Sequence, residues 1–144
     1  MLILFGLSVT AGLLALSIPI VLDHFVTINL RTEADKFVKR NSWAQAEESV
    51  NGRYQCLGLG NPCESIGRFY RLDKHITREG FQSSLERAGW PLAVIGDCIL
   101  TNVEFHVDSV CRATGIANGF NIHVNISASG ETEFVTLTLT KLSR

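Results

Sequence analysis

The pattern of hydrophobic and polar positions changes sharply near residue 23. Residues 1–22 contain no Asp, Glu, Lys, Arg or His. A helix of that length spans a hydrocarbon core of about 30 Å. From Asp23 onward, charged residues recur every few positions. The pattern predicts a transmembrane anchor over residues 1–22 that holds a water-soluble domain of about 120 residues at a membrane.

A cleaved signal peptide is the competing interpretation of this apolar stretch. Such peptides have a basic start, an apolar run of about 7–15 residues and a small-residue cleavage site. Here no basic residue precedes the run, which continues to Leu22, so we favour an uncleaved span. Its small residues recur at four-residue offsets, which permit close helix packing, although we favour ordinary span composition over a specific contact as their explanation: Gly6, Ser8, Ala11, Gly12 and Ala15.

A helical period follows the anchor. Apolar side chains recur at helical offsets in two groups with one slip between them, and Thr32 is a suitable N-cap: Ala34, Phe37, Val38, Trp43, Ala46 and Val50. This spacing predicts an amphipathic helical extension over residues 23–50. Residues 51–75 contain turn residues without any period, which indicates a loop.

A second helix has clear end signals. Thr77 is placed to cap its start, and Ile76 with Phe81 matches a hydrophobic staple. Gly89 stands where a left-handed C-terminal cap belongs, and Pro91 prevents continuation. These signals predict a helix over residues 78–88.

The period then changes to two. Apolar and polar residues alternate over 100–111, 119–127 and 133–142, and residues 128–131 form a suitable hairpin turn. Residues 92–95 are a candidate edge strand. We therefore predict an α+β fold: an N-terminal transmembrane helix with its amphipathic extension, packed on an antiparallel β-meander of three or four strands. Residues 51–144 form the single soluble α+β domain in this prediction.

The four cysteines group as Cys56 with Cys63 and Cys98 with Cys111. Neither pair has the spacing of a zinc or redox motif, and each is able to close a short loop as a disulfide. An even count in a small anchored domain indicates an oxidising compartment. Four buried free thiols are the alternative interpretation, and the way the cysteines pair stays open.

Membrane orientation receives opposite indications from charge and from cysteine content. Basic residues follow the apolar stretch and none precedes it, which favours a cytoplasmic domain: Arg31, Lys36, Lys39 and Arg40. The cysteines favour an extracytoplasmic domain. We favour the extracytoplasmic placement, because paired cysteines are a more specific pattern than basic residues diluted by neighbouring acids.

Candidate chemistry is sparse. Glu104, His106 and Asp108 share one face of a predicted strand, and His123 lies on a neighbouring one, so a metal site is conceivable there. The polar face of a half-exposed sheet explains the same residues, and we expect no metal, no cofactor and no enzymatic activity. With 13 basic against 14 acidic residues and no basic stripe, the chain is not expected to bind nucleic acid.

The order of these parts resembles the layout of type IV pilins and of tight-adherence pseudopilins, whose first helix is half anchor and half domain scaffold. Pilins of the main family have Glu at the fifth mature position, where this chain has Phe5. The resemblance implies a structural subunit whose domain lies outside the cytoplasm and whose N-terminal helix packs against other subunits.

We therefore expect a membrane-anchored structural or assembly protein, pilin-like or pseudopilin-like, that forms homo- or hetero-oligomers through its N-terminal helix. A single-span accessory subunit of a larger membrane complex is the alternative. A third possibility is an anchored binding or metal-dependent domain that uses the polar sheet face around His106 and His123.

Overall fold

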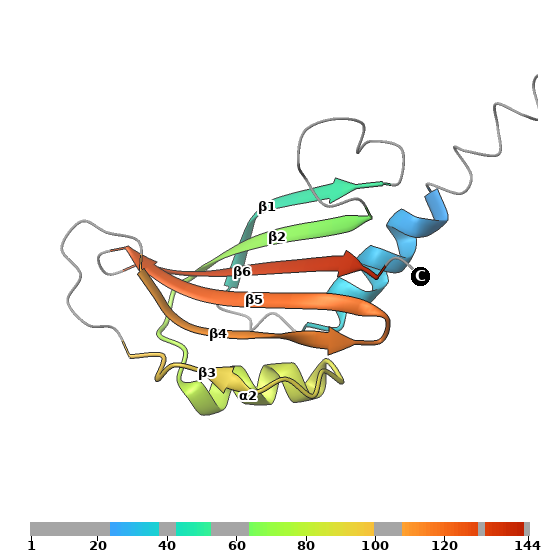
Figure 1. Cartoon of the computed structure of the whole chain (residues 1–144). Helices are drawn as coiled ribbons and strands as arrows, with labels where there is room; N and C mark the ends of the chain where they lie inside the picture. Colours follow the sequence, from blue (N-terminus) through green and yellow to red (C-terminus); the bar gives the residue numbers. More distant parts are fainter. Residues whose placement is uncertain (1–23, 38–42, 53–63, 100–107, 130–131, 143–144) are drawn as a thin grey trace, which may run out of the picture.

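The computed structural model describes residues 24–37, 43–52, 64–99, 108–129 and 132–142. These residues form one antiparallel sheet with the strand order β1-β2-β6-β5-β4-β3 (Figure 1). The strands are β1 (Trp43–Asn51), β2 (Ser65–Leu72), β3 (Val94–Ile95), β4 (Asp108–Ala117), β5 (Phe120–Ser129) and β6 (Thr132–Lys141). The last strand, β6, therefore lies in the interior of the sheet, between β2 and β5.

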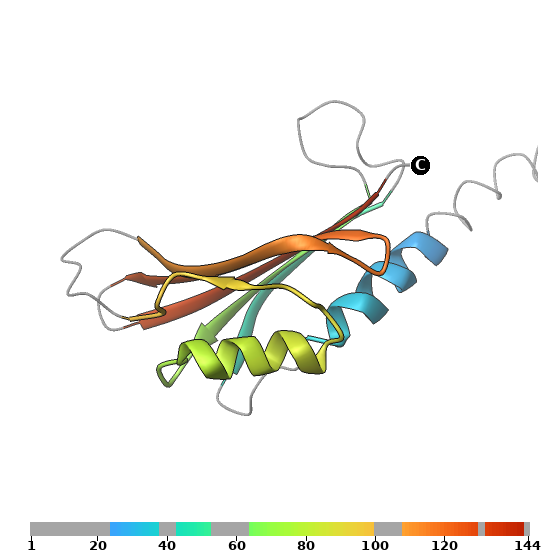
Figure 2. The same cartoon turned by 60° about the horizontal axis from the view of Figure 1, so that its bottom comes forward.

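Two helical segments lie on the same side of this sheet, as Figure 2 shows. One is helical over residues 24–35, hereafter the 24–35 helix. The other is α2 (Arg78–Arg87). The core lies between the helices and the inner sheet face, and its largest fully buried side chains are Trp90, Tyr70, Phe81, Leu30, Ile66, Ile76, Leu85, Ile122, Ile126, Leu137, Leu139 and Val124. Each such aliphatic or Phe side chain contributes about 1.5–3 kcal/mol of burial free energy.

The opposite side of the sheet is not covered by any helix of the described residues, and we call it the open face. Burial alternates along β6, where Val135, Leu137 and Leu139 are fully buried and the threonines between them are half-buried. Burial alternates in the same way along β5 from Phe120 to Asn125, and Ser127 farther along the strand is buried. Because successive strand residues point to opposite faces, the half-buried and exposed residues line the open face.

The local predictions for α2 and for two strands are confirmed. The Thr77 hydroxyl accepts a hydrogen bond from the Gly80 amide at 3.2 Å, and Gly89 has a φ of 72°. Ile76 and Phe81 are both buried. The alternation over 119–127 and 133–142 corresponds to β5 and β6, and the 92–95 segment supplies the short edge strand β3.

The predicted fold class is wrong. The described chain is a mainly β structure with six strands in one sheet, not an α+β domain with a meander of three or four strands. The amphipathic extension does not continue to residue 50, since the chain is helical only to residue 35 and enters β1 at Trp43. The loop expected over 51–75 contains β2. A strand was expected over residues 100–111, and the described strand β4 begins at Asp108.

Two departures from strict alternation explain why the sequence of β1 was interpreted as a helix and that of β2 as a loop. A bulge between Gln45 and Glu47 shifts the register of β1, so its inward positions are not evenly spaced by two. In β2, Arg68 occupies an inward position between Ile66 and Tyr70. A charged residue on the buried face hides the period of two on which the recognition of a strand depends.

The anchor predicted over residues 1–22 lies outside the described residues, and so do its candidate packing residues Gly6, Ser8, Ala11, Gly12 and Ala15. Within the ranges that are described, no helix is both long enough and apolar enough to cross a membrane.

The β4–β5 hairpin has a two-residue turn, Asn118-Gly119, with φ angles of 54° and 81°. We predict that Gly119→Ala destabilises the protein by about 1 kcal/mol, because a side chain disfavours the left-handed region. A Cβ there would meet no atom within 4 Å, so the cost is conformational and not steric. Urea unfolding of the purified chain measures it. Ser83→Ala, at an exposed position of α2, is the control, and equal stability of the two variants would contradict the turn assignment.

Candidate functional site

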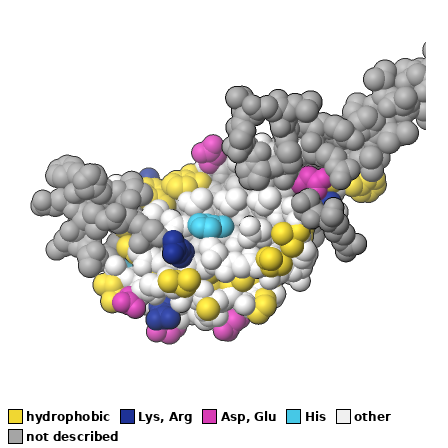
Figure 3. Space-filling view, viewed as in Figure 1, with side chains coloured by type: hydrophobic (Ala, Val, Ile, Leu, Met, Phe, Trp, Pro, Cys, Tyr) yellow, Lys and Arg dark blue, Asp and Glu magenta, His cyan; other side chains and the backbone are white. Residues whose placement is uncertain are grey.

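The side chains of the open face form rows that cross the strands. The pairing places Glu47, Phe69, Thr136, Asn125 and Arg112 in one row, from β1 to β4. Strands lie about 4.8 Å apart, and successive rows about 6.8 Å apart. In the space-filling view of Figure 3, white predominates in the middle of this surface, which marks backbone and uncharged polar side chains.

His123 lies in the next row, on β5, beside the central strand β6. It is exposed, and its cross-strand partners are Thr114 on β4 and Thr138 on β6. The same row continues to Gly67 on β2, which has no side chain. The middle of the open face is therefore an array of hydroxyl, imidazole and backbone groups, in which the Ser49 hydroxyl lies against Gly67.

An aromatic pair borders this array. The rings of Phe69 and Phe134 stack with their centroids 5.1 Å apart. Both side chains are half-buried, although they lie on the face that has no helical cover. Such a pair supplies apolar contact area beside the polar array, and this combination suits the binding of another surface.

The candidate metal ligands are not brought together by the described chain. Asp108 pairs with Ala128, five residues from His123 along β5, which corresponds to about 17 Å. Glu104 and His106 lie outside the described residues. Among the residues that are described, no cluster of three or more His, Cys, Asp or Glu side chains is arranged to hold a metal ion.

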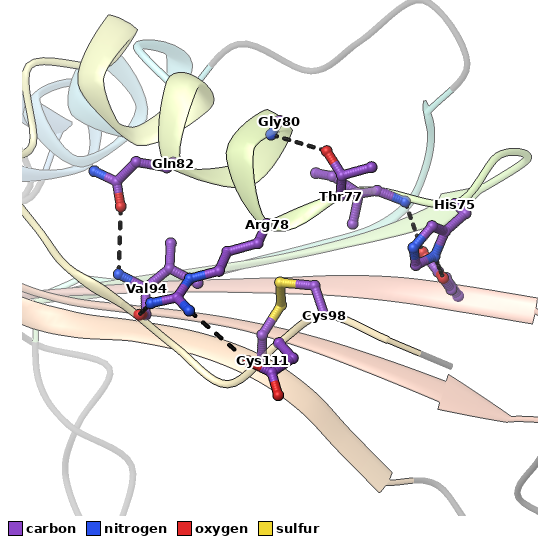
Figure 4. The surroundings of a disulfide bond; sticks show 11 residues. His75, Thr77, Arg78, Gly80, Gln82, Val94, Cys98 and Cys111 are labelled. Atoms are coloured by element: carbon purple, nitrogen blue, oxygen red, sulfur yellow. Dashed lines mark hydrogen bonds and ion pairs between the residues drawn. A yellow bond between two sulfur atoms is a disulfide. The ribbon is translucent and has the colours of Figure 1, made fainter. Parts of the chain in front are cut away.

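A disulfide closes the segment between β3 and β4 (Figure 4). It joins Cys98 to Cys111, whose Cα atoms are 4.8 Å apart, and both residues are buried. Gly96 precedes it with a φ of 95°, where an added Cβ would lie 2.7 Å from a β4 carbonyl oxygen. Cys98 and Cys111 are one of the two cysteine pairs that the sequence groups together. The other two cysteines, Cys56 and Cys63, lie outside the described residues.

Strand β3 and the residues just before it are bound to α2. The Arg78 guanidinium donates to the Val94 carbonyl at 3.1 Å, and the Gln82 side chain accepts from the Val94 amide at 3.4 Å. The Gln82 amide also donates to the Leu92 carbonyl at 3.2 Å. Figure 4 shows Arg78 and Gln82 reaching from α2 toward the edge of the sheet. These contacts hold the edge strand β3 under the helix.

Glu33, on the 24–35 helix, is a buried charge that joins distant parts of the chain. One carboxylate oxygen accepts from the Trp90 indole at 2.9 Å and from the Asn118 amide at 2.8 Å. The other lies 2.6 Å from the Lys36 ammonium. Burial acts to raise the pKa of Glu33, but the hydrogen bonds from Lys36, Asn118 and Trp90 outweigh it, so the pKa lies below its ordinary value.

Arg68 forms a second buried centre near the C-terminal end of the same helix. Its guanidinium lies 2.6 Å from the carboxylate of Asp35 and 2.9 Å from that of Glu48 on β1. Burial acts to lower the pKa of Arg68, but the hydrogen bonds with Asp35 and Tyr70 raise it above its ordinary value. Glu48 also binds Arg31 of the helix at 3.0 Å. The network ties the 24–35 helix to β1 and β2.

Sequence reasoning missed both of these networks. Glu33 and Arg68 read as ordinary surface charges, because only the tertiary contacts place them in the core. The Asn118-Gly119 pair was the available signal for the β4–β5 hairpin, since this dipeptide favours a two-residue turn. Recognition of that turn would have placed Thr114 opposite His123.

No protein-family model matches the chain, and no match was found among curated proteins or among solved structures.

We predict that Glu33→Gln lowers the free energy of unfolding by about 1.5–3 kcal/mol at neutral pH, the typical worth of hydrogen bonds to a charged group. Because the folded-state pKa of Glu33 is lowered, its stabilisation is present above the unfolded-state pKa and is lost as pH falls through the folded-state value. The difference in the free energy of unfolding between wild type and variant therefore decreases as the pH is lowered. Urea titrations across the acid range measure it, with Asp73→Asn as an exposed control. A gap that does not vary with pH would contradict the assignment.

Proposed function

We propose that this protein is a structural subunit of a membrane-associated assembly, with an apolar N-terminal segment in the membrane and its sheet domain outside the cytoplasm. The observation that supports it best is the fastening of the 24–35 helix. Buried charges bind this helix to β1, β2, the β4–β5 turn and Trp90. A segment held in the membrane next to this helix would therefore fix the position of the whole domain.

Membrane attachment has support from both the sequence and the helix surface. The uncharged stretch over residues 1–22 directly precedes the described helix. Within that helix, Phe25 is 59% exposed and Ile28 is 43% exposed. Residues three apart lie on one side of a helix, so the apolar character continues on its outer surface. These side chains suit the boundary between a bilayer and water.

One observation favours the extracytoplasmic side. The Cys98–Cys111 disulfide suits an oxidising compartment. The basic residues that would favour a cytoplasmic domain include Arg31 and Lys36, and these form ion pairs with Glu48 and Glu33. These ion pairs belong to the folded domain, whereas the charge rule counts basic residues and not net charge, so the opposite indication from Arg31 and Lys36 stands beside that of the disulfide.

A pilin-like or pseudopilin-like subunit is one form of this proposal. The second form is an accessory subunit of a larger membrane complex, which the exposed pair Phe25 and Ile28 favours as a contact for a neighbouring helix. Purification in mild detergent separates the two forms: an accessory subunit is recovered with other proteins in a fixed ratio, whereas a self-assembling subunit is recovered with copies of itself.

Membrane fractionation tests the anchor. We expect the chain to stay in the membrane pellet after an alkaline carbonate wash, and the double variant Leu13→Arg with Leu14→Arg to move to the soluble fraction, because each Arg at the centre of a span costs about 2.5–3.5 kcal/mol. Ser83→Arg with Ala93→Arg adds the same charge at exposed positions and should stay in the pellet. Wild-type chain in the soluble fraction would overturn the proposal.

Cysteine alkylation tests the compartment. Cells are quenched in acid and the chain is alkylated in denaturant, with and without prior reduction. We expect Cys98 and Cys111 to be alkylated only after reduction. In a Cys98→Ser control, Cys111 should react without reductant, which shows that the reagent reaches this site. Free reaction of both cysteines in the wild type would place the domain in a reducing compartment.

A further inference from the structure

The open face is poor in charge for a solvated sheet surface. Of the described residues that the register places on it, only Glu47, Arg71 and Arg112 are charged, and they stand toward its margins. The interior holds Thr, Asn and His side chains and Gly67, with the Phe69–Phe134 pair beside them. Interface centres are depleted in charged residues and enriched in aromatic ones, so this composition suits a buried contact.

The size of the open face also suits a contact. Five long strands contribute to it, in the order β1-β2-β6-β5-β4, and the shortest has eight residues. With strands about 4.8 Å apart and a rise of about 3.3 Å per residue, the face covers roughly 650 Å² in projection. A standard interface buries about 800 Å² of accessible surface per partner. The projected area of the open face is therefore of the same order as the area that one partner contributes to a standard interface.

The position of the 24–35 helix restricts the geometry of a partner. The N-terminal end of this helix projects past one end of the strands in both Figure 1 and Figure 2. The open face therefore runs along the side of the domain. Two copies attached to one membrane would have their helices at the same end and their open faces free to meet side by side.

We propose that two copies of this chain pack through their open faces, related by a two-fold axis that runs along β6. This inference rests on the proposed function, because attachment to a common membrane orients the two copies. The axis places β6 against β6 of the second copy, β2 against β5, and β1 against β4. Sheets packed face to face keep their strands within about 30° of each other, so corresponding rows stay close.

This arrangement brings complementary residues together. In the row from Glu47 to Arg112, the axis passes near Thr136, so the Glu47 carboxylate of each copy faces the Arg112 guanidinium of the other. The contact occurs twice in the dimer, once on each side of the axis. Both side chains are exposed, and neither forms an ion pair with another residue of the described ranges. A second copy therefore supplies the opposite charge to each.

The neighbouring row is complementary in its hydrogen-bonding groups. Its members run from Ser49 through Gly67, Thr138 and His123 to Thr114. The same axis places the His123 imidazole of each copy over Gly67 of the other. A Cβ at Gly67 would lie 3.0 Å from the Ser49 hydroxyl, so this hydroxyl borders the place that the ring would take, and Thr138 faces itself at the axis. Donor and acceptor groups on both surfaces are suited to direct or water-mediated hydrogen bonds.

Charge reversal tests the axis. The purified chain in detergent is compared with Glu47→Arg, Arg112→Glu and the double variant, by mass photometry over a concentration series. We expect a concentration-dependent dimer for the wild type and a dissociation constant at least about tenfold higher for each single variant, because like charges then face each other twice. The double variant restores the opposite charges and should return to the wild-type constant. Glu79→Arg on α2 is the control and should leave it unchanged.

Each other outcome overturns the dimer. A wild-type chain that stays monomeric, a dimer insensitive to all the reversals, or a double variant no better than the single ones would exclude this face and axis. Recovery of a different protein that is lost in Glu47→Arg would assign the face to that protein instead. Circular dichroism confirms that the variants fold. Failure here is distinguishable from failure of the proposed function, since the carbonate wash reports on membrane attachment alone.

Discussion

The buried guanidinium of Arg68 is the contact on which the N-terminal half of the fold depends. It lies on the inward side of β2, only 8% exposed, and it is neutralised by Asp35 from the helix and Glu48 from β1. Removal of one member of such a group leaves an uncompensated charge in a poorly solvated place. An unpaired Arg68 charge would destabilise the fold at this place. The helix and β1 must therefore both pack against β2 for that strand to be stable.

β2 transmits this constraint to the rest of the sheet. Its other edge pairs along its full length with β6, the last strand of the chain, so the first and last parts of the described sequence close on each other. Glu33 binds the same helix to Trp90 and to the β4–β5 turn at Asn118. The helix is therefore held at two places along its length by contacts to four separate segments, which makes it a firm connection between the domain and the residues before it.

The division of polar groups between the two sides of the sheet bears on function. Charges on the helical side are paired and serve cohesion, as the networks of Glu33 and Arg68 show. The open face is nearly neutral, flat and rich in hydroxyl and amide groups. Such a surface is suited to contact with another protein surface, whereas Glu33 and Arg68, the central members of the charged networks, are buried on the other side of the sheet. The charges that hold the fold together thus lie on the side of the sheet opposite to the open face.

The sequence by itself determined the elements whose signals are local. Thr77 and Gly89 mark the two ends of α2. The strict alternation of apolar and polar residues in β5 and β6 identifies both strands and their outward residues, including His123. It did not determine β1 and β2, because a bulge and an inward arginine break their period, and both are tolerated only through contacts distant in sequence. The neighbours of His123 and the central place of β6 likewise depended on strand pairing, which is fixed by the packing of the whole core and not by any short stretch of residues.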